Sequence, residues 1–458
     1  MHTDVLIIGA GLSGISAGIR LAHFGKKVAI FERHYLPGGL NSYYHRNGVS
    51  IDVGLHAMTN FAPDGERSAP LNKLLRQLRL KRASLGLCPI NHSLILFPGA
   101  MLRLENDLNA LNEQVAARFP QDAIGFQTLC KRIAETDSMS LEPIRDSARA
   151  ILEQHISTPL LREMLLCPTM FYGNARMDDM DFSQFCIMFQ SLFMEGMARP
   201  HDGMKHVITL LLERYQELGG TICLGNGIAR LTCHDGHVVE IMDDKGEMHT
   251  ADVVLSCCGA TETASLCDIE QPTLRQSPPG SMGFLEAIFE LDRPPAEVGL
   301  EAGIIFRSRR ESFRFHLPSE GIDLESQVIC MPGNFTGCQD ISAARHVRMT
   351  VQASPAWWMA LPKEDYKYAK QAAAAKLLAV LEEVAPGVQS TVISSELFTP
   401  KTIQRFTGHR NGAIYGSPVK NLTGTTDCDN LFICGTDQGF LGIVGSLMSG
   451  CIIANRVM

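Results

Sequence analysis

The chain has 458 residues, of which 45% are hydrophobic and 20% are charged, and its formal net charge is −8 at pH 7. This length suffices for two domains or for one large discontinuous fold. The acidic balance and the lack of long Lys/Arg runs argue against a nucleic-acid partner, because nucleic-acid phosphates require a concentrated basic patch.

The 14 cysteines include no CxxC pair and no Cys/His spacing typical of a metal site. We therefore predict reduced thiols in an intracellular protein, and no metal site. A predicted strand begins within the first few residues, which leaves no room for a signal peptide. No window offers the roughly 18 uninterrupted apolar residues of a membrane span. We expect a cytoplasmic protein, or one that contacts a membrane only peripherally through its surface.

The first predicted element is a strand at residues 4–8 (DVLII), an apolar run that is bounded by glycine and typical of a parallel strand buried on both faces. The following segment places Ile15, Ile19 and Ala22 on one face of a helix. A second strand is predicted at residues 28–31 (VAIF). The three elements together predict a βαβ unit.

The pattern then changes along the chain. Residues 90–200 predict helical segments that are separated by polar or proline breaks. Strand patterns return in residues 201–270, and residues 280–400 combine strand runs such as FLEAIFEL with a long amphipathic helix at about 364–384. The end of the chain predicts one strand, LFICG, and one helix.

Strand-rich pieces at the start, middle and end of the chain predict an α/β fold with a discontinuous cofactor domain. We assign residues 1–90, 201–275 and 400–458 to a Rossmann-type domain with a parallel sheet. We assign residues 91–200 and 276–399 to an inserted α+β domain that binds the substrate.

The loop after the first strand carries a GxGxxG motif in its required context, after a strand and before a helix. Gly9 permits the tight turn, Gly11 lets backbone amides approach a pyrophosphate, and Gly14 allows close helix packing. Glu32 ends the second strand, 18 residues after Gly14, where an acid can accept both ribose hydroxyls of an adenosine. These residues predict a dinucleotide site.

A second glycine pair, Gly38 and Gly39, follows, and Asp52 and Gly54 come after it. A nicotinamide dehydrogenase has no evident use for this pair, whereas the longer FAD needs close backbone approach farther along its body. With these motifs the chain resembles the flavin-containing amine oxidase and phytoene desaturase superfamily, whose members continue the Rossmann motif into such a GG motif. The resemblance implies FAD as the cofactor and places Gly38, Gly39 and Gly54 against it.

The resemblance is incomplete directly after the glycine pair. The family commonly has an arginine there, where this chain has Leu40 and Asn41. The resemblance therefore implies that Asn41 faces the cofactor. Arg33 or Arg46 would supply the positive charge near the pyrophosphate, and Arg33 is the first choice.

The last strand and its glycine-rich turn resemble the segment that holds the flavin end of FAD in this superfamily. Backbone amides at the start of the helix that begins near Ile443 would stabilise negative charge on the reduced ring. The matching positions are Gly435, Asp437, Gly442, Ile443 and Val444.

Two further stretches resemble the branch that contains phytoene desaturases, carotenoid isomerases and retinol saturases. Members of that branch act on long isoprenoid or polyene chains by hydride transfer to or from FAD, so the resemblance implies an apolar small-molecule substrate. The matching residues are Arg199, Pro200, Gly203 and Met204 in the first stretch and Gly412 and Gly416 in the second, where the glycines would border the active site.

Three residues within flavin-facing segments are candidates for positions near the isoalloxazine ring and for a catalytic role: His56, Gln438 and Phe440. A hydrogen-bonded structural histidine is an equally strong interpretation of His56, and also of His409. The flavin itself carries out most of a hydride transfer, so no obligatory acid or base is expected.

Residues 182–197 place apolar side chains at helical spacing, either as the wall of a substrate tunnel or membrane-side entrance, or as plain core. The stripe consists of Phe182, Phe185, Phe189, Leu192 and Phe193.

Two alternative functions remain open. An amine oxidase of the same fold needs an aromatic cage, and the chain has only 8 tyrosines and 2 tryptophans, the latter at Trp357 and Trp358. A non-enzymatic lipid carrier similar to the chaperones of prenylated GTPases would not need the complete set of FAD motifs. The sequence does not predict the oligomeric state.

Overall fold

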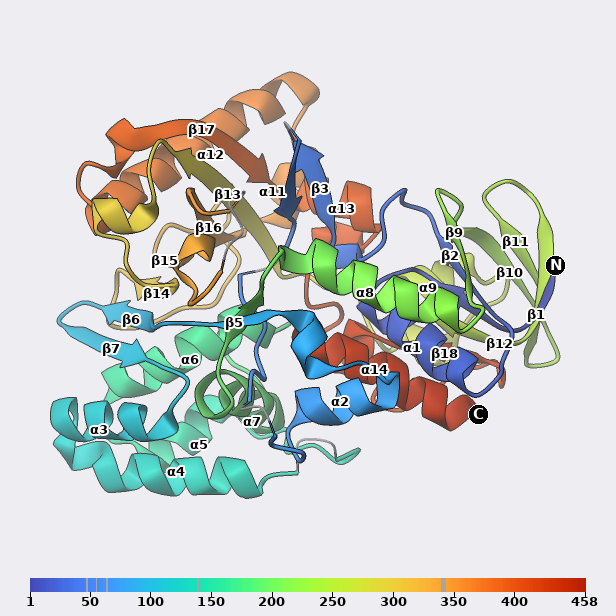
Figure 1. Cartoon of the computed structure of the whole chain (residues 1–458), viewed down its shortest axis with the longest axis horizontal. Helices are drawn as coiled ribbons and strands as arrows, with labels where there is room; N and C mark the ends of the chain where they lie inside the picture. The colour runs from blue at the N-terminus through green and yellow to red at the C-terminus, as the bar shows by residue number, and fades with distance from the viewer. Residues whose placement is uncertain (47, 55, 63–64, 138–139, 339–342) are drawn as a thin grey trace.

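The structure is a computed structural model that describes residues 1–46, 48–54, 56–62, 65–137, 140–338 and 343–458. Within these ranges, two seven-stranded sheets form two halves that lie side by side in Figure 1. Both termini lie in the same half, so the beginning and the end of the chain build one unit (Figure 1).

The first sheet contains the predicted βαβ unit, because β1 pairs in parallel with β2 and helix α1 (Leu12–His23) connects them. The strand order is β10-β11-β12-β1-β2-β9, and β18 pairs in parallel with β12. The strands are β1 (His2–Ile8), β2 (Val28–Glu32), β9 (Thr221–Leu224), β10 (Ile228–His234), β11 (His237–Asp243), β12 (Met248–Ser256) and β18 (Leu431–Ile433).

Both faces of this sheet are covered, which explains the apolar run in β1. Alternate residues of β1, Val5 and Ile7, belong to the core shared with the helices on one face. Leu6 and Ile8 belong to the core under the β10–β11 arm on the other face. The helices of the first face include α1, α2 (Pro70–Leu78), α8 (Gly203–Glu217) and α14 (Gly442–Val457).

Glycines let α1 approach both the sheet and the C-terminal helix. A Cβ atom added at Gly14 would lie 2.1 Å from the carbonyl oxygen of Gly9, so only glycine fits there. A Cβ atom at Gly450 of α14 would lie 2.0 Å from the carbonyl oxygen of Ser13. The two ends of the chain are therefore held against each other next to the glycine-rich loop.

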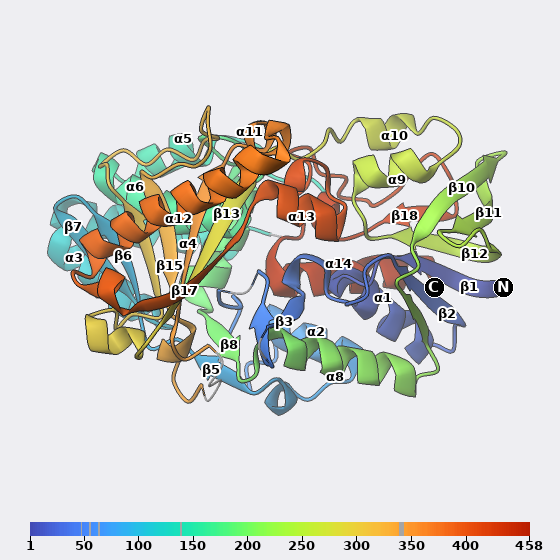
Figure 2. The same ribbon diagram turned by 90° about the horizontal axis from the view of Figure 1, so that it is seen from above.

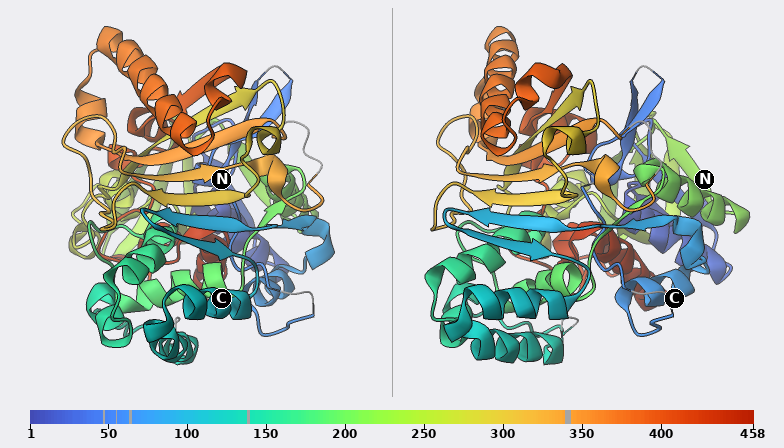
Figure 3. Two further views of the ribbon diagram at one scale, coloured as in Figure 1. Left: turned by 90° about the vertical axis from the view of Figure 1, so that its left-hand side faces the viewer. Right: turned by 60° about the vertical axis from the view of Figure 1, so that its left-hand side comes forward.

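The second sheet has the order β17-β13-β16-β15-β14-β6-β7 and is antiparallel except where β14 pairs with β6. Helix α12 (Lys363–Val384), predicted at about 364–384, covers one face, and a layer of helices covers the other (Figure 3). The strands are β6 (Ser93–Phe97), β7 (Ala100–Leu104), β13 (Gly283–Leu291), β14 (Ile304–Ser308), β15 (Ser326–Cys330), β16 (His346–Ala353) and β17 (Val392–Phe398). The helical layer contains α3 (Leu108–Arg118), α4 (Ala123–Glu135), α5 (Ala148–His155), α6 (Pro159–Gly173) and α7 (Phe182–Phe189).

One element departs from the sequence prediction. The hairpin β6–β7 lies in residues 90–200, which we expected to be helical. Alternate residues of β6 are buried, and Ile304 of the inserted segment pairs with its first residue, Ser93. This pairing partner lies more than two hundred positions away along the chain, so a local helical reading of the surrounding segment misses the strand.

Among the short elements, β3 and α13 lie where the two halves meet (Figure 2). The strands of the first sheet come from residues 1–90, 201–275 and 400–458, and those of the second from 91–200 and 276–399. The division into domains at these boundaries stays a prediction. The remaining strands and α-helices are β3 (Tyr43–Arg46), β4 (Val49–Asp52), β5 (Leu87–Pro89), β8 (Ala198–Pro200), α9 (Ala260–Leu266), α10 (Pro272–Arg275), α11 (Pro355–Ala360) and α13 (Pro400–Thr407).

Candidate active site

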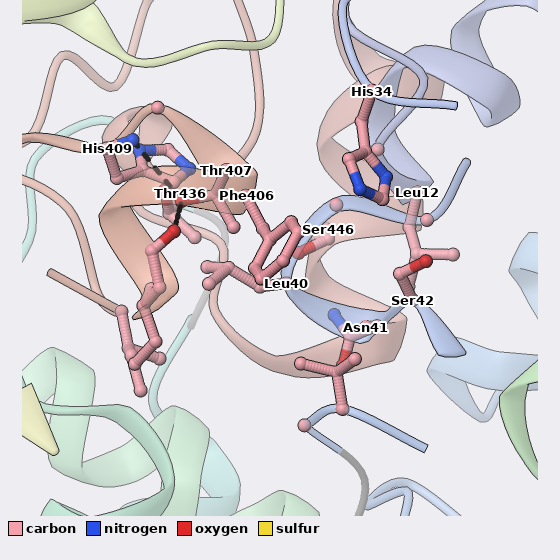
Figure 4. Close-up of a pocket in the computed structure, with 18 of the residues that line it drawn as sticks. Leu12, His34, Leu40, Asn41, Ser42, Phe406, Thr407, His409, Thr436 and Ser446 are labelled. Atoms are coloured by element: carbon pink, nitrogen blue, oxygen red, sulfur yellow. Dashed lines mark hydrogen bonds between the residues drawn. The ribbon is translucent and has the colours of Figure 1, made fainter. Parts of the chain in front are cut away.

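A cavity of about 730 Å³ has a lining that joins the glycine-rich loop after β1, the loop after β2, the N-terminus of α14 and the strands β13, β15 and β16 of the second sheet. Figure 4 shows part of this lining, with Asn41 from the N-terminal segment near Phe406 and Ser446 from the C-terminal segment. The two ends of the chain and the inserted segments thus share one cavity.

The GxGxxG loop borders the cavity through its first two glycines. Gly9 and Gly11 line it, and a Cβ atom at Gly11 would meet no atom within 4 Å, so its backbone is open to a ligand. Gly14 does not line the cavity and serves the packing of α1. Glu32 also lines the cavity, and its two carboxylate oxygens accept the backbone N–H groups of Ala10 at 2.7 Å and His34 at 2.8 Å.

The second glycine pair lies directly beside the first motif. The backbone N–H of Gly38 donates to the carbonyl oxygen of Ala10 at 2.7 Å, and both Gly38 (φ 108°) and Gly39 (φ 57°) have left-handed backbones that favour glycine. Gly38, Gly39, Asn41 and Gly54 all line the cavity, as expected for the second glycine motif. A Cβ atom at Gly54 would lie 2.5 Å from a backbone oxygen, so this turn requires glycine.

Of the two candidates for the missing family arginine, Arg33 lines the cavity and Arg46 does not. The guanidinium of Arg33 donates one hydrogen bond to the carbonyl oxygen of Arg405 at 3.1 Å, and its role near a pyrophosphate stays a prediction. Arg46 lies 2.9 Å from the carboxylate of Glu396. Both side chains are engaged in contacts with the C-terminal third of the chain.

The C-terminal segment contributes its turn and the first turn of α14. Gly435, Gly442 and Ile443 line the cavity, and α14 begins at Gly442, close to the predicted start. Val444 is buried in the core behind the helix. Asp437 is buried away from the lining, where its carboxylate accepts two backbone N–H groups at 2.7 Å each and fixes the turn.

The arrangement fits an extended dinucleotide. The residues before α1 and α14 offer no side chain that caps the first N–H groups of either helix, and the first residues of both helices border the cavity. Uncapped helix N-termini present N–H donors and partial positive charge to an anion. The N-terminus of α1 could hold a pyrophosphate, and that of α14 could face a reduced flavin ring.

Of the three catalytic candidates, only His56 lines the cavity. Gln438 is buried and lies outside the lining, because its amide donates to the carbonyl oxygen of Leu422 at 3.2 Å and accepts from Ser449 at 2.6 Å. Phe440 also lies outside the lining. His409 lines the cavity, and its backbone N–H donates to the hydroxyl of Thr407 (Figure 4).

His56 belongs to a polar group within the cavity wall. Its Nε2 lies 2.9 Å from Oγ1 of Thr350 and 3.7 Å from a carboxylate oxygen of Glu286. Glu286 is paired with the buried Arg348, whose Nε lies 2.5 Å from the carboxylate. Burial, followed by the charges of Arg348 and Arg199, lowers the pKa of His56 to about 3, so its ring is neutral near pH 7.

Sequence motifs did not identify Glu286 and Thr350 as parts of the cavity wall, or Arg348 as the partner of Glu286 behind it. The signal that marks them is weak: a charged residue within an apolar strand, such as the first glutamate of FLEAIFEL. In β13, Phe284 and Glu286 face the cavity, while the alternating Leu285 packs under α12. Only the pairing of β13 with β16 places Glu286 opposite Thr350.

A second buried pair joins two of the motifs. The guanidinium of Arg199 donates to the carboxylate of Asp52 at 2.5 Å, and the same carboxylate accepts the backbone N–H of Met204 at 2.8 Å. A Cβ atom at Gly203 would lie 2.5 Å from this carboxylate. The residues of the Arg-Pro…Gly-Met stretch therefore anchor α8 to the strand that leads to Gly54.

The remaining wall of the cavity is mostly apolar. Its members come from α6, α7, the second sheet and the C-terminal segment: Phe171, Tyr172, Met188, Phe284, Val328, Ile414, Tyr415 and Leu441. The aromatic stripe is not this wall, so its interpretation as a tunnel is wrong. Its side chains form the core of the helical layer, namely Phe182, Phe185, Phe189, Leu192 and Phe193.

A profile of the family described as flavin containing amine oxidoreductases matches residues 12–458. The chain belongs to this family. It is therefore a flavin-dependent enzyme with FAD as its cofactor. The lipid-carrier alternative does not hold for this member of the family.

Curated relatives of this family member act in different ways. The chain is 21% identical to the chloroplastic prolycopene isomerase of Arabidopsis thaliana, over 99% of this chain and 82% of the relative. It is 24% identical to the 4,4'-diaponeurosporene oxygenase of Staphylococcus aureus, over 56% of each chain.

Solved structures share the fold. An oxidoreductase from Methanosarcina mazei superposes with a TM-score of 0.69 at 17% identity, covering 99% of this chain and 100% of the other. Cyclohexylamine oxidase from Brevibacterium oxydans superposes with a TM-score of 0.65 at 14% identity, covering 99% and 98%. The predicted α/β fold with a parallel Rossmann-type sheet is confirmed. In the part of the chain that the structure describes, no helix has the length and apolarity needed to cross a membrane.

Proposed function

We propose that this chain is an FAD-dependent oxidoreductase or isomerase of an apolar isoprenoid or polyene. One observation carries the proposal: the cavity that begins at the GxGxxG loop continues into a wall of apolar side chains, including Phe284 and Val328. An apolar wall favours a hydrocarbon chain because burial of apolar surface drives its binding. The carotenoid-modifying relatives support the same substrate class.

The chain's own residues have distinct roles in this proposal. The N-terminus of α1 and the backbone at Gly11 hold the pyrophosphate of FAD, and Glu32 accepts hydrogen bonds from the ribose. Backbone amides of Gly442 and Ile443 at the start of α14 face the ring, and Asp437 positions their turn from behind. Bound FAD supplies hydride transfer. The protein positions the substrate chain and excludes water.

The charges at the apolar end of the cavity favour an isoprenoid or polyene over an amine as the substrate. A charged ammonium substrate would be favoured by a carboxylate that has no other cation as its partner. Glu286 is the carboxylate beside the apolar side chains in the described lining, and Arg348 already neutralises it.

We propose that the protein is cytoplasmic and contacts a membrane peripherally. A substrate dissolved in a membrane would then reach the cavity directly from the lipid surface. Phe406 supports this: it lines the cavity and is 43% exposed, which places an aromatic side chain at a cavity opening. Lys401 and Arg405 lie on the same helix. Co-sedimentation with anionic phospholipid vesicles is expected for the wild type and reduced for Phe406→Ser, and equal co-sedimentation of both would contradict this contact.

The function is tested on the purified protein with FAD bound. Under anaerobic conditions, prolycopene, lycopene and phytoene are each added to the oxidised and to the reduced protein, and products are separated by chromatography. We expect an isomerised, desaturated or saturated product from at least one polyene. Peroxide formation with amines, combined with no conversion of any polyene, would establish the amine oxidase alternative instead.

A further inference from the structure

The hydrogen bonds around His56 form a chain that ends in a buried ion pair. His56 Nε2 lies 2.9 Å from Thr350 Oγ1, and the Thr350 hydroxyl donates to Oε2 of Glu286 at 3.3 Å. The other oxygen of Glu286 accepts from Arg348, which also donates to the carbonyl oxygen of Val53 at 2.8 Å. The side chains of Glu286, Thr350 and Arg348 are buried, which limits their movement.

Counting protons along this chain fixes the tautomer of His56. Burial raises the pKa of Glu286, but the charge and hydrogen bonds of the buried Arg348 guanidinium act in the opposite direction and hold Glu286 as a carboxylate, which can only accept hydrogen bonds. The single hydroxyl proton of Thr350 therefore goes to Glu286, and the Thr350 oxygen must accept from His56 Nε2–H. Because the ring is neutral, its one proton is on Nε2, and Nδ1 carries a lone pair.

This second nitrogen is open to the cavity. Within the described ranges, His56 Nδ1 has no hydrogen-bond partner in the protein, and the atom is not fully buried. The His56 side chain is 15% exposed and lines the cavity. Its surroundings are apolar: Phe284 precedes Glu286 by two residues on the same face of β13, and Val328 pairs with Thr350. His56 Nδ1 is thus an acceptor beside apolar side chains, in a wall that also contains the buried hydroxyl of Tyr172.

We propose that His56 Nδ1 accepts a hydrogen bond from a hydroxyl group of the substrate, and that the site therefore takes an isoprenoid alcohol in preference to a hydrocarbon. Thr350 is the positioning residue that sets the tautomer. This inference rests on the proposed function, because it names the substrate class of the same cavity. Because Nδ1 can only accept a hydrogen bond, it favours an alcohol over an ether or an aldehyde of the same chain.

The first test measures binding rather than turnover. The protein with FAD bound is titrated with farnesol, farnesyl methyl ether, farnesal and farnesene, and the change in flavin absorption gives each Kd. We expect farnesol to bind about tenfold more tightly than the ether, the aldehyde and the hydrocarbon, the effect of one neutral hydrogen bond. Equal binding of farnesol and the ether would overturn the inference, and so would tighter binding of farnesal, which requires a donor at this position.

Variants then identify the positioning residue. Thr350→Val removes the acceptor for Nε2–H and is expected to abolish the preference for farnesol, whereas Thr350→Ser retains it. The matched control is Thr59→Val, because Thr59 lines the same cavity but donates its hydroxyl to Asn60 at 3.0 Å. An unchanged preference in Thr350→Val, or equal loss in Thr59→Val, would contradict the role of Thr350.

The outcomes separate this inference from the proposed function. If farnesol shows the expected preference but no isoprenoid or polyene is converted, the proposed function fails and the acceptor role of His56 stands. If polyenes are converted but farnesol shows no preference, the inference fails and the function stands. Tighter binding and oxidation of farnesylamine would overturn the alcohol as the substrate class, together with the proposed function.

Discussion

The buried ion pair beside the cavity leads to a quantitative prediction for stability. The side chain of Arg348 is 2% exposed and that of Glu286 is 11% exposed. Arg348→Met keeps an apolar chain of similar length but leaves the Glu286 carboxylate without its cation. It also removes the hydrogen bond to the carbonyl oxygen of Val53. Breaking a buried pair from one side costs about 3–5 kcal/mol, because the remaining charge stays desolvated.

The assay is urea unfolding of the FAD-loaded protein, followed by fluorescence. We expect Arg348→Met to lose about 3–5 kcal/mol, and Glu286→Leu combined with Arg348→Met to recover more than half of that loss. The control is Arg310→Met, which breaks an exposed pair with Glu325 and should leave the unfolding curve nearly unchanged, because water screens this pair. The reasoning is refuted if Arg348→Met lowers the free energy of unfolding no more than Arg310→Met does. It is also refuted if the double variant loses as much as Arg348→Met and Glu286→Leu lose separately, added together.

Three further predictions concern the glycine loop, the pH dependence and the C-terminal turn. Gly14→Ala should lower the melting temperature strongly, because its Cβ would lie 2.1 Å from a backbone oxygen. Gly11→Ala should leave the melting temperature of the FAD-free protein unchanged, because its Cβ would enter open space. It should weaken FAD binding at least about tenfold, because FAD needs that space to approach the backbone. Equal losses of stability in Gly14→Ala and Gly11→Ala would contradict this. The pKa of His56 is lowered to about 3 in the folded state, so below roughly pH 6.5 the unfolded state binds a proton that the folded state does not bind. The free energy of unfolding should therefore fall by about 1.4 kcal/mol per pH unit as the pH decreases from there. His56→Gln should lack this part of the pH dependence in urea unfolding between pH 7 and 5; the same difference in unfolding free energy between variant and wild type at every pH would disprove it. Asp437→Asn should cost about 1–3 kcal/mol, because its amide cannot accept both backbone N–H groups at 2.7 Å; loss of flavin with unchanged stability would instead indicate direct contact between Asp437 and FAD.

The cofactor end of the cavity was accessible to prediction because its chemistry is local. Gly9, Gly11 and Glu32 line the cavity at the positions that the motif predicts, since a tight turn and a strand end are set by a few adjacent residues. Predictions from segment resemblance alone were less accurate. Gln438 and Phe440 lie in the right segment but outside the lining, because the side-chain direction within a turn depends on packing from behind it.

The substrate end could not be predicted in this way. Whether an apolar stripe becomes core or cavity wall depends on which elements cover it, and for Phe182 and Phe189 the covering helices belong to the same layer. The partners Glu286 and Thr350 are 64 residues apart, so only the strand pairing brings them together.

The sequence by itself determined the family, the cofactor and the βαβ unit, since each depends on short-range patterns of glycine, acid and apolar residues. Tertiary structure alone decided which nitrogen of His56 faces the cavity. That orientation follows from Thr350, Glu286 and Arg348, which come from strands of the inserted segment. A tautomer is set by the hydrogen bonds around the ring, and those bonds exist only once distant strands have paired.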